Sequence, residues 1–199
     1  MVSLEVVKQS NGLISSTLPP KLVALFVGAT SGIGEITMKK LAQYSIEPRI
    51  YFVGRSQEAA ARIIGECKLL NSKGEYTFIQ QDVCLIRNVD KLCNDFKKLE
   101  GTLDLLVLSQ GVRSLDRSVT KENIHLLAAL NYYSRVRFMT NLIGLLQKST
   151  SLSRVLTVGG GSKEGPVDTD DFPALHVPFA GIRDHLTSMI TLALETVAR

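Results

Sequence analysis

Five short apolar runs recur along the chain, and none of them alternates regularly with polar residues. They are rich in β-branched and aromatic side chains, a pattern typical of strands that are covered on both faces of a sheet. The runs predict strands at residues 22–27, 49–53, 76–80, 103–108 and 154–158. The segments between and after them predict helices at about 33–45, 57–71, 88–99, 121–148 and 180 to the end.

Strands that alternate with helices in this way indicate a parallel sheet wound by right-handed crossovers. The sequence therefore predicts a Rossmann-type, doubly wound α/β fold with three α/β/α layers, in a single domain over residues 1–199. One loop differs from the rest. Residues 159–178, rich in glycine, proline and acidic residues, follow the fifth predicted strand, and a loop of that length at the carboxyl end of a strand is usually functional or mobile.

Composition excludes several classes of protein. The 199 residues include 23 Lys and Arg against 19 Asp and Glu, and the basic residues are scattered, so we expect no nucleic-acid surface. The cysteines are odd in number and lack metal-ligand spacing, so we expect reduced thiols at Cys67, Cys84 and Cys93. There is no secretory signal and no apolar run of about 20 residues, so we expect a cytoplasmic protein without a membrane span.

The stretch FVGATSGIGE, residues 26–35, is the strongest candidate for a binding site. It joins the first predicted strand to the first predicted helix. Gly28 permits a tight turn, Gly32 lets the backbone approach a pyrophosphate, and Gly34 allows the helix to pack closely on the strand. The free amides and dipole of the helix would then attract phosphate groups. An ordinary tight loop between strand and helix is the alternative.

The segment GATSGIG resembles the cofactor turn of the short-chain dehydrogenase/reductase family. Further segments match in the family's order and span residues 26 to 172: YFVGRS, LSQG, LNYYSRVRF and GGGSKEGPVDTDDF. Together they are most similar to the atypical family members of fungal secondary-metabolite biosynthesis. The family's sheet normally continues beyond the fifth strand–helix unit, so we expect a truncated fold. In the glycine turn, the resemblance implies that the cofactor is held by Gly28, Thr30, Ser31, Gly32, Ile33 and Gly34.

The second predicted strand ends in VGRS, residues 53–56. An acidic residue at this point would hydrogen-bond the ribose hydroxyl of NAD. Arg55 stands there instead, with Ser56 beside it, and its guanidinium can bind a 2′-phosphate. NADP is therefore favoured over NAD as the cofactor. A solvated arginine at the strand end is the alternative.

Two later loops complete the implied cofactor site. The resemblance implies that Asp82 accepts a hydrogen bond from the adenine amino group and that Val83 packs on the ring. Asp82 can also cap a helix, and the two roles are compatible. LSQG stands where the family has Asn-Asn-Ala-Gly: Gly111 is kept, whereas Ser109 and Gln110 depart from the pattern, although Ser109 can still donate a hydrogen bond near the cofactor.

The family's catalytic residues are not matched. There, a serine orients the carbonyl, a tyrosine donates the proton, and a lysine four residues later lowers the tyrosine pKa. In this chain the serine position falls on Gly160, and no tyrosine follows Tyr133. The nearest match to the tyrosine and lysine positions is Phe179 and Arg183, and phenylalanine has no proton to donate.

Two other residues are candidates for catalysis. Asn131 matches the helical asparagine that, in the family, kinks the helix and joins a proton relay; a core polar residue with satisfied hydrogen bonds is the alternative. Lys163 follows the fifth strand and can replace the missing cation; the alternative is a solvated lysine paired with Glu164 or Asp168.

Further titratable residues lie near the end of the chain. His176 and His185 are possible acids, although both are more often surface or capping residues. By helical spacing, His185 should face away from Arg183. The spacing of Asp168, Asp170 and Asp171 lacks the glycine and final glutamate of a calcium loop, so we expect no metal.

These observations predict an NADP-dependent oxidoreductase that acts on a small secondary-metabolite intermediate without the usual Ser, Tyr and Lys. Two alternatives remain, a redox-silent isomerase or cyclase on the same fold and a non-catalytic NADP-binding partner subunit. The retained glycine turn and Arg55 argue against a pure scaffold. The family builds its dimer face from the fourth and fifth helices, so a homodimer through these helices is also expected.

Overall fold

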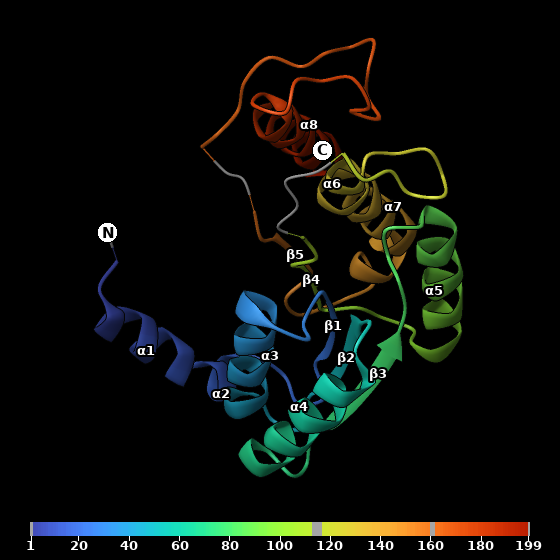
Figure 1. Ribbon diagram of the computed structural model, residues 1–199. Coiled ribbons are helices and arrows are strands. Elements are labelled where there is room, and N and C mark those ends of the chain that lie inside the picture. Colours follow the sequence, from blue (N-terminus) through green and yellow to red (C-terminus); the bar gives the residue numbers. More distant parts are fainter. Residues whose placement is uncertain (1, 113–116, 160–161, 199) are drawn as a thin grey trace. The chain divides into compact units, whose positions relative to one another are not determined.

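A computed structural model describes residues 2–112, 117–159 and 162–198. The Rossmann-type, doubly wound α/β fold predicted from the sequence is confirmed, with one sheet in the order β3-β2-β1-β4-β5 (Figure 1). The pairs β1–β2, β2–β3 and β1–β4 are parallel. The order reverses direction between β1 and β4, where open α/β sheets bind their ligands. The strands are β1 (Val23–Val27), β2 (Arg49–Gly54), β3 (Glu75–Gln80), β4 (Leu105–Leu108) and β5 (Arg154–Thr157).

Four of the five predicted helices lie within two residues of their predicted limits. They are α3 (Gly32–Tyr44), α4 (Gln57–Leu70), α5 (Ile86–Leu99) and α8 (Ile182–Ala198). The predicted helix 121–148 is wrong at its start, because Val119 and His125 form an isolated antiparallel bridge there. It also changes hydrogen-bonding pattern along its length, and consists of α6 (Leu126–Ala128), the π-helical turn η1 (Ala129–Tyr133) and α7 (Ser134–Leu146).

Two helices near the N-terminus were not predicted from the sequence, α1 (Leu4–Gly12) and α2 (Ile14–Thr17). Ser3 begins α1 as its N-cap and accepts a 3.4 Å hydrogen bond from the Val6 N–H. Neither helix buries a residue. The sequence therefore lacks the apolar stripe from which a helix is usually predicted. Among the described residues, no helix is both long and apolar enough to cross a membrane.

The chain divides into two compact units. The first comprises Met1–Gln80, Gly101–Leu108 and Leu145–Leu156, and it contains α1 to α4 and the sheet up to Leu156. The second comprises Gln81–Glu100, Ser109–Gly144 and Thr157–Arg199, and it contains α5, α6, η1, most of α7, and α8. The single domain predicted over residues 1–199 stays a prediction.

The core of the first unit is the centre of the sheet. Every residue of β1 and β4 is buried, as expected for strands covered on both faces. Asp104, just before β4, is also buried, and its carboxylate accepts hydrogen bonds from the Val23 N–H at 2.8 Å and from the Ser149 and Ser151 hydroxyls at 2.6 and 2.8 Å. This one carboxylate therefore ties β1 to the segment that leads into β5.

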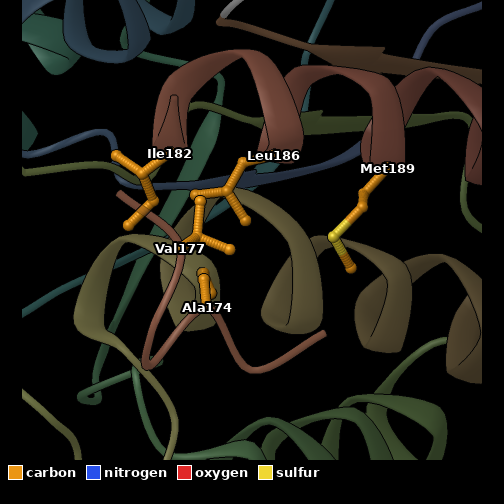
Figure 2. Packing of buried hydrophobic residues seen from close by; sticks show 6 residues of the cluster. Ala174, Val177, Ile182, Leu186 and Met189 are labelled. Carbon is orange, nitrogen blue, oxygen red and sulfur yellow. The ribbon is translucent and has the colours of Figure 1, made fainter. Parts of the chain in front are cut away.

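The core of the second unit forms where α8 packs on a loop and on α6. Ile182, Leu186 and Met189 recur at helical spacing along α8 and face Ala174 and Val177 (Figure 2). Ala128 of α6 belongs to the same cluster, and all six residues are at most 5% exposed. This spacing places one apolar face of α8 against the long loop that follows β5.

Four charged side chains join α3 to α4 in the first unit. Glu35 of α3 accepts hydrogen bonds from both terminal nitrogens of Arg62 on α4, at 2.8 and 3.0 Å, and pairs with Lys39. Glu66 pairs with Arg62 at 3.0 Å and with Lys39. The Arg62 guanidinium holds the pKa of Glu35 at about 2, although burial opposes this shift.

We predict that Glu35→Gln lowers the free energy of unfolding by about 1–2 kcal/mol at neutral pH, because Arg62 and Lys39 lose a buried carboxylate partner. The folded-state pKa of Glu35 lies below its ordinary value of 4.5. The stabilisation is therefore present above that value and is lost as the pH falls toward about 2. Urea denaturation across this pH range measures it, with Glu58→Gln on the exposed face of α4 as the control. A difference that stays constant down to about pH 3 would contradict the prediction.

Candidate cofactor and active site

The glycine turn between β1 and α3 requires glycine at two positions. Gly28 and Gly32 have φ angles of 78° and 61°, a backbone conformation that other L-residues rarely adopt. A Cβ built on Gly32 meets no atom within 4 Å, so conformation rather than space excludes a side chain there. The Gly28 N–H donates to the Val53 carbonyl at 3.0 Å, which fixes the start of the turn to the end of β2.

The first turn of α3 presents free backbone donors. Ser31 is the N-cap, but its side chain makes no capping hydrogen bond. In the described part of the chain, no hydrogen bond occupies the N–H groups of residues 32–34. Ser31, Gly32 and Ile33 are exposed, whereas Gly34 is buried. A helix start of this kind attracts anions, and phosphate in particular.

Thr30, inside the turn, packs directly on Gly54 at the end of β2. A Cβ built on Gly54 would lie 2.3 Å from Thr30 Cγ2 and 2.9 Å from its Oγ1, so only glycine fits at position 54. Gly54 was not among the site residues predicted from the sequence. Its position directly before Arg55 in VGRS could have indicated that it belongs to the site.

Arg55 follows Gly54 at the same edge of the sheet as the glycine turn. Its side chain is exposed, and among the described residues the guanidinium makes no hydrogen bond or ion pair. The backbone is fixed, because the Arg55 carbonyl accepts a 3.0 Å hydrogen bond from Gln80 Nε2. Ser56 is the N-cap of α4, and its hydroxyl oxygen accepts from the Ala59 N–H at 3.1 Å. The structure thus leaves the Arg55 guanidinium available for an anion and gives the Ser56 oxygen a structural role.

In the second unit, Asp82 and Val83 begin the segment that leads into α5. Asp82 Oδ1 accepts from the Cys84 N–H at 3.1 Å, which closes a local turn. Asp82 is not the N-cap of α5, since Leu85 takes that place. The Glu122 carboxylate instead accepts from the first N–H groups of α5, those of Ile86 at 2.6 Å and Arg87 at 3.2 Å. Val83 is buried.

The loop after β4 is held by buried polar contacts within the second unit. Gln110 is 3% exposed; its Nε2 donates to the Ser134 hydroxyl at 3.1 Å, and its backbone carbonyl accepts from Arg135 at 2.7 Å. Gln110 Oε1 has no partner among the described residues. Gly111 lies close to the amide of Asn131, because a Cβ built on it would be 3.8 Å from Asn131 Oδ1. Ser109 is half-buried.

Asn131 lies within the π-helical turn η1. Its Nδ2 donates to the Leu127 carbonyl at 3.0 Å, and its Oδ1 accepts from Arg135 at 3.4 Å. Short π-helical turns inside α-helices are frequent at functional sites. The irregular helix expected around Asn131 is therefore present, and its part in a proton relay stays a prediction.

Lys163 is exposed and forms no ion pair with any described residue. Its exposure fits the alternative of a solvated lysine, but no pairing with Glu164 or Asp168 is found among the described residues; Glu164 accepts from the Thr191 hydroxyl of α8 at 3.0 Å. Gly160, at the position of the family's serine, lies outside the described residues.

The segment after Lys163 is bound along α8. Ser188 accepts from the Gly165 N–H at 2.9 Å and donates to its carbonyl at 2.7 Å. The Asp168 N–H donates to His185 Nδ1 at 3.1 Å. The expectation of a surface or capping role for His185 is wrong, because this side chain is 1% exposed and accepts from the loop. Arg183 is exposed, so the two side chains do face different ways as predicted.

The remaining acidic and thiol groups have structural roles. Asp171 is buried and accepts from the N–H groups of Leu175, His176 and Val177 at 2.6–2.9 Å. Burial opposes ionisation, but these bonds hold the pKa of Asp171 below its usual range. Burial raises the pKa of Cys67 to about 11 and that of Cys93 to about 12, so both stay as unreactive thiols. Within the described ranges, no group of three such side chains is placed to hold a metal ion.

An apolar groove of about 340 Å³ lies on the second unit. Leu192 and Phe172 are 57% and 46% exposed along it. The homodimer expected through the fourth and fifth predicted helices stays a prediction. The groove is lined from α8, from the α7 helix and its preceding turn, and from the long loop by Tyr132, Val136, Thr140, Val167, Phe172, Met189, Leu192, Ala193, Thr196 and Val197.

A doubly wound sheet with a glycine turn after β1 defines a dinucleotide-binding class of protein. A family model described as short chain dehydrogenase matches residues 22–167. The chain belongs to this family.

Its relatives include fungal oxidoreductases. The chain is 40% identical to Oxidoreductase AN1596 of Emericella nidulans and 38% identical to Oxidoreductase andH of Emericella variicolor. Each alignment covers 100% of this chain, but only 60% and 59% of these two proteins. The chain thus spans about three fifths of the length of the curated relatives it matches. Among solved structures, the fold is similar to a metagenomic short-chain oxidoreductase in complex with NADP, with a TM-score of 0.68 at 18% identity over 90% of this chain and 77% of that one.

We predict that Gly54→Ala lowers the free energy of unfolding by about 1–3 kcal/mol, because the new methyl group overlaps Thr30. Thermal and urea denaturation measure the loss. Adding Thr30→Ala should recover most of it, since both clashing atoms are then removed. Gly65→Ala is the matched control: a Cβ there meets nothing within 4 Å, so this variant should be neutral or up to about 1 kcal/mol more stable. Equal effects at positions 54 and 65 would refute the packing.

Proposed function

We propose that the chain is an NADP-dependent oxidoreductase of the short-chain dehydrogenase/reductase type that acts on a small secondary-metabolite intermediate. One arrangement carries the proposal. The glycine turn after β1 and Arg55 after β2 stand at the same edge of two adjacent parallel strands, with Val27 in register with Val53. Among the described residues, nothing occupies the amide donors of the turn, and nothing pairs with the guanidinium of Arg55, one residue beyond the strand.

These groups suit the two anionic parts of NADP. The amides of residues 32–34 and the dipole of α3 would hold the diphosphate. The Arg55 guanidinium would hold the 2′-phosphate through paired hydrogen bonds, which a lysine or a neutral side chain cannot reproduce. Thr30 would keep the turn seated on Gly54. When bound, the reduced cofactor supplies a hydride to the substrate.

In the second unit, we propose that Asp82 and Val83 bind the adenine of the cofactor. The turn to Cys84 uses only Oδ1 of Asp82, so Oδ2 stays available to accept from the adenine amino group. Val83 supplies an apolar surface for the ring. The local turn and the adenine contact are therefore compatible roles of one carboxylate.

The relatives named as oxidoreductases support redox chemistry, whereas the residues at the catalytic positions favour a second candidate. Phe179 and Arg183 stand where the family has tyrosine and lysine, and Phe179 is 38% exposed and has no hydroxyl group. A redox-silent isomerase or cyclase would use the same fold to orient a reactive substrate, since positioning alone lowers barriers substantially. In both cases we propose that Asn131 and Lys163 contribute to the reaction; Lys163 has no ion-pair partner among the described residues.

We predict that NADPH raises the melting temperature of the chain more than NADH does and that Arg55→Ala abolishes the difference. The variant should weaken NADPH binding about ten- to hundredfold, because hydrogen bonds between charged groups are lost. Arg154→Ala is the control, since Arg154 is an exposed arginine at the start of β5, a strand that does not adjoin β2 in the sheet. Equal stabilisation of the unchanged protein by both cofactors would remove the 2′-phosphate assignment.

We further predict that carbonyl intermediates of fungal secondary metabolism are reduced at the expense of NADPH. The decay of NADPH absorbance during product formation measures this reaction. Product formed at constant absorbance would overturn the redox assignment and favour the isomerase or cyclase. The same assay with Lys163→Ala tests its proposed role, and an unchanged rate would exclude Lys163 from catalysis.

A further inference from the structure

Arg135 of α7 is a buried cation without a carboxylate partner. Its side chain reaches several neighbouring segments of the second unit and is 3% exposed. In the described part of the chain, it forms no ion pair. Its hydrogen bonds to the described residues end on neutral oxygens: Leu130 O at 3.3 Å, Thr157 Oγ1 at 2.5 Å, Val158 O at 2.8 Å, Gln110 O at 2.7 Å and Asn131 Oδ1 at 3.4 Å.

Such burial leaves a positive charge that is hydrogen-bonded but not neutralised. An unpaired charge inside a protein is costly, and burial lowers the pKa of Arg135 to about 10, so it still carries its charge at neutral pH. Negative charge that arrives close to it is stabilised more strongly than in water, because the surroundings screen it weakly. The network fixes this charge beside the residues that follow β4 and those that end β5.

Thr157 is the hydroxyl residue that this charge contacts. It is the last residue of β5 and is half-buried. Ligands of open α/β sheets bind at the carboxyl ends of the strands. Because Thr157 Oγ1 accepts from Arg135, its own proton must point elsewhere, and among the described residues that proton has no acceptor. A hydroxyl that accepts from a cation is polarised and becomes a stronger donor.

We propose that Thr157, polarised by Arg135, donates a hydrogen bond to a substrate carbonyl oxygen and stabilises the negative charge that develops on it. Thr157 is then the catalytic residue, and Arg135 is the positioning residue that acts through it. The inference rests on the proposed function only in taking a carbonyl compound as the substrate. Both reduction and enolisation place negative charge on that oxygen, and a preorganised donor stabilises it.

The test uses 4-nitrophenol as an oxyanion probe, because its phenolate has a distinct visible absorbance. The protein is titrated with the probe below the probe's own pKa, in the presence and absence of NADPH. We expect the unchanged protein to increase the phenolate fraction. Thr157→Val should abolish this increase and weaken phenolate binding about tenfold or more, whereas Thr157→Ser should retain it. Arg135→Met should behave like Thr157→Val.

Thr140→Val is the matched control, since Thr140 is exposed and, among the described residues, its hydroxyl bonds the Arg137 carbonyl of the same helix. Circular dichroism confirms that each variant is folded; if Arg135→Met unfolds, the Val and Ser variants of Thr157 still decide the outcome. No phenolate with the unchanged protein, or equal phenolate with Thr157→Val, would overturn the inference. NADPH-induced thermal stabilisation is measured on the same samples. If the unchanged protein binds phenolate but is not stabilised by NADPH, the cofactor assignment alone is refuted. If it is stabilised by NADPH but does not bind phenolate, the role of Thr157 alone is refuted.

Discussion

The left-handed backbone at Gly28 and Gly32 is the constraint on which the cofactor turn depends. Two residues with φ of 78° and 61° carry the chain from the end of β1 into α3 and leave the first amides of that helix unoccupied. Thr30 lies between them and fills the space that the missing side chain of Gly54 leaves at the end of β2. The turn and the segment with Arg55 are therefore packed together, so a change at one strand end is transmitted to the other.

Local physical chemistry made the sheet and the turn predictable from the sequence. The run LVALFV has no polar alternation, and the strand it forms is buried along its whole length. Gly28 and Gly32 stand where the backbone needs positive φ, so their spacing alone located the turn. The helix α1 was not predicted because it buries no residue. Its sequence therefore does not need apolar residues at helical spacing.

The polar interior of the second unit was not predictable, because its partners are distant in sequence. Glu122 was expected inside a helix, yet it receives the first amides of α5. His185 is buried because a loop amide seventeen residues earlier donates to its ring. Arg135 has the sequence neighbourhood of an ordinary basic residue on a helix. Only the folded chain brings it to Gln110 and Val158, 25 and 23 positions away.

A tyrosine hydroxyl gives up its proton near neutral pH more readily when a cation lies beside it. The family places both on one helix, four residues apart. The nearest match to those positions that the sequence offers is Phe179 and Arg183, both of which are exposed. Among the described residues, a hydroxyl and a cation meet elsewhere. Thr157 and Arg135 are 22 positions apart in sequence, and Arg135 Nη1 donates to Thr157 Oγ1 at 2.5 Å. The donor that we propose therefore stands at the end of a strand, and the chemistry open to it is set by which substrate oxygen reaches Thr157.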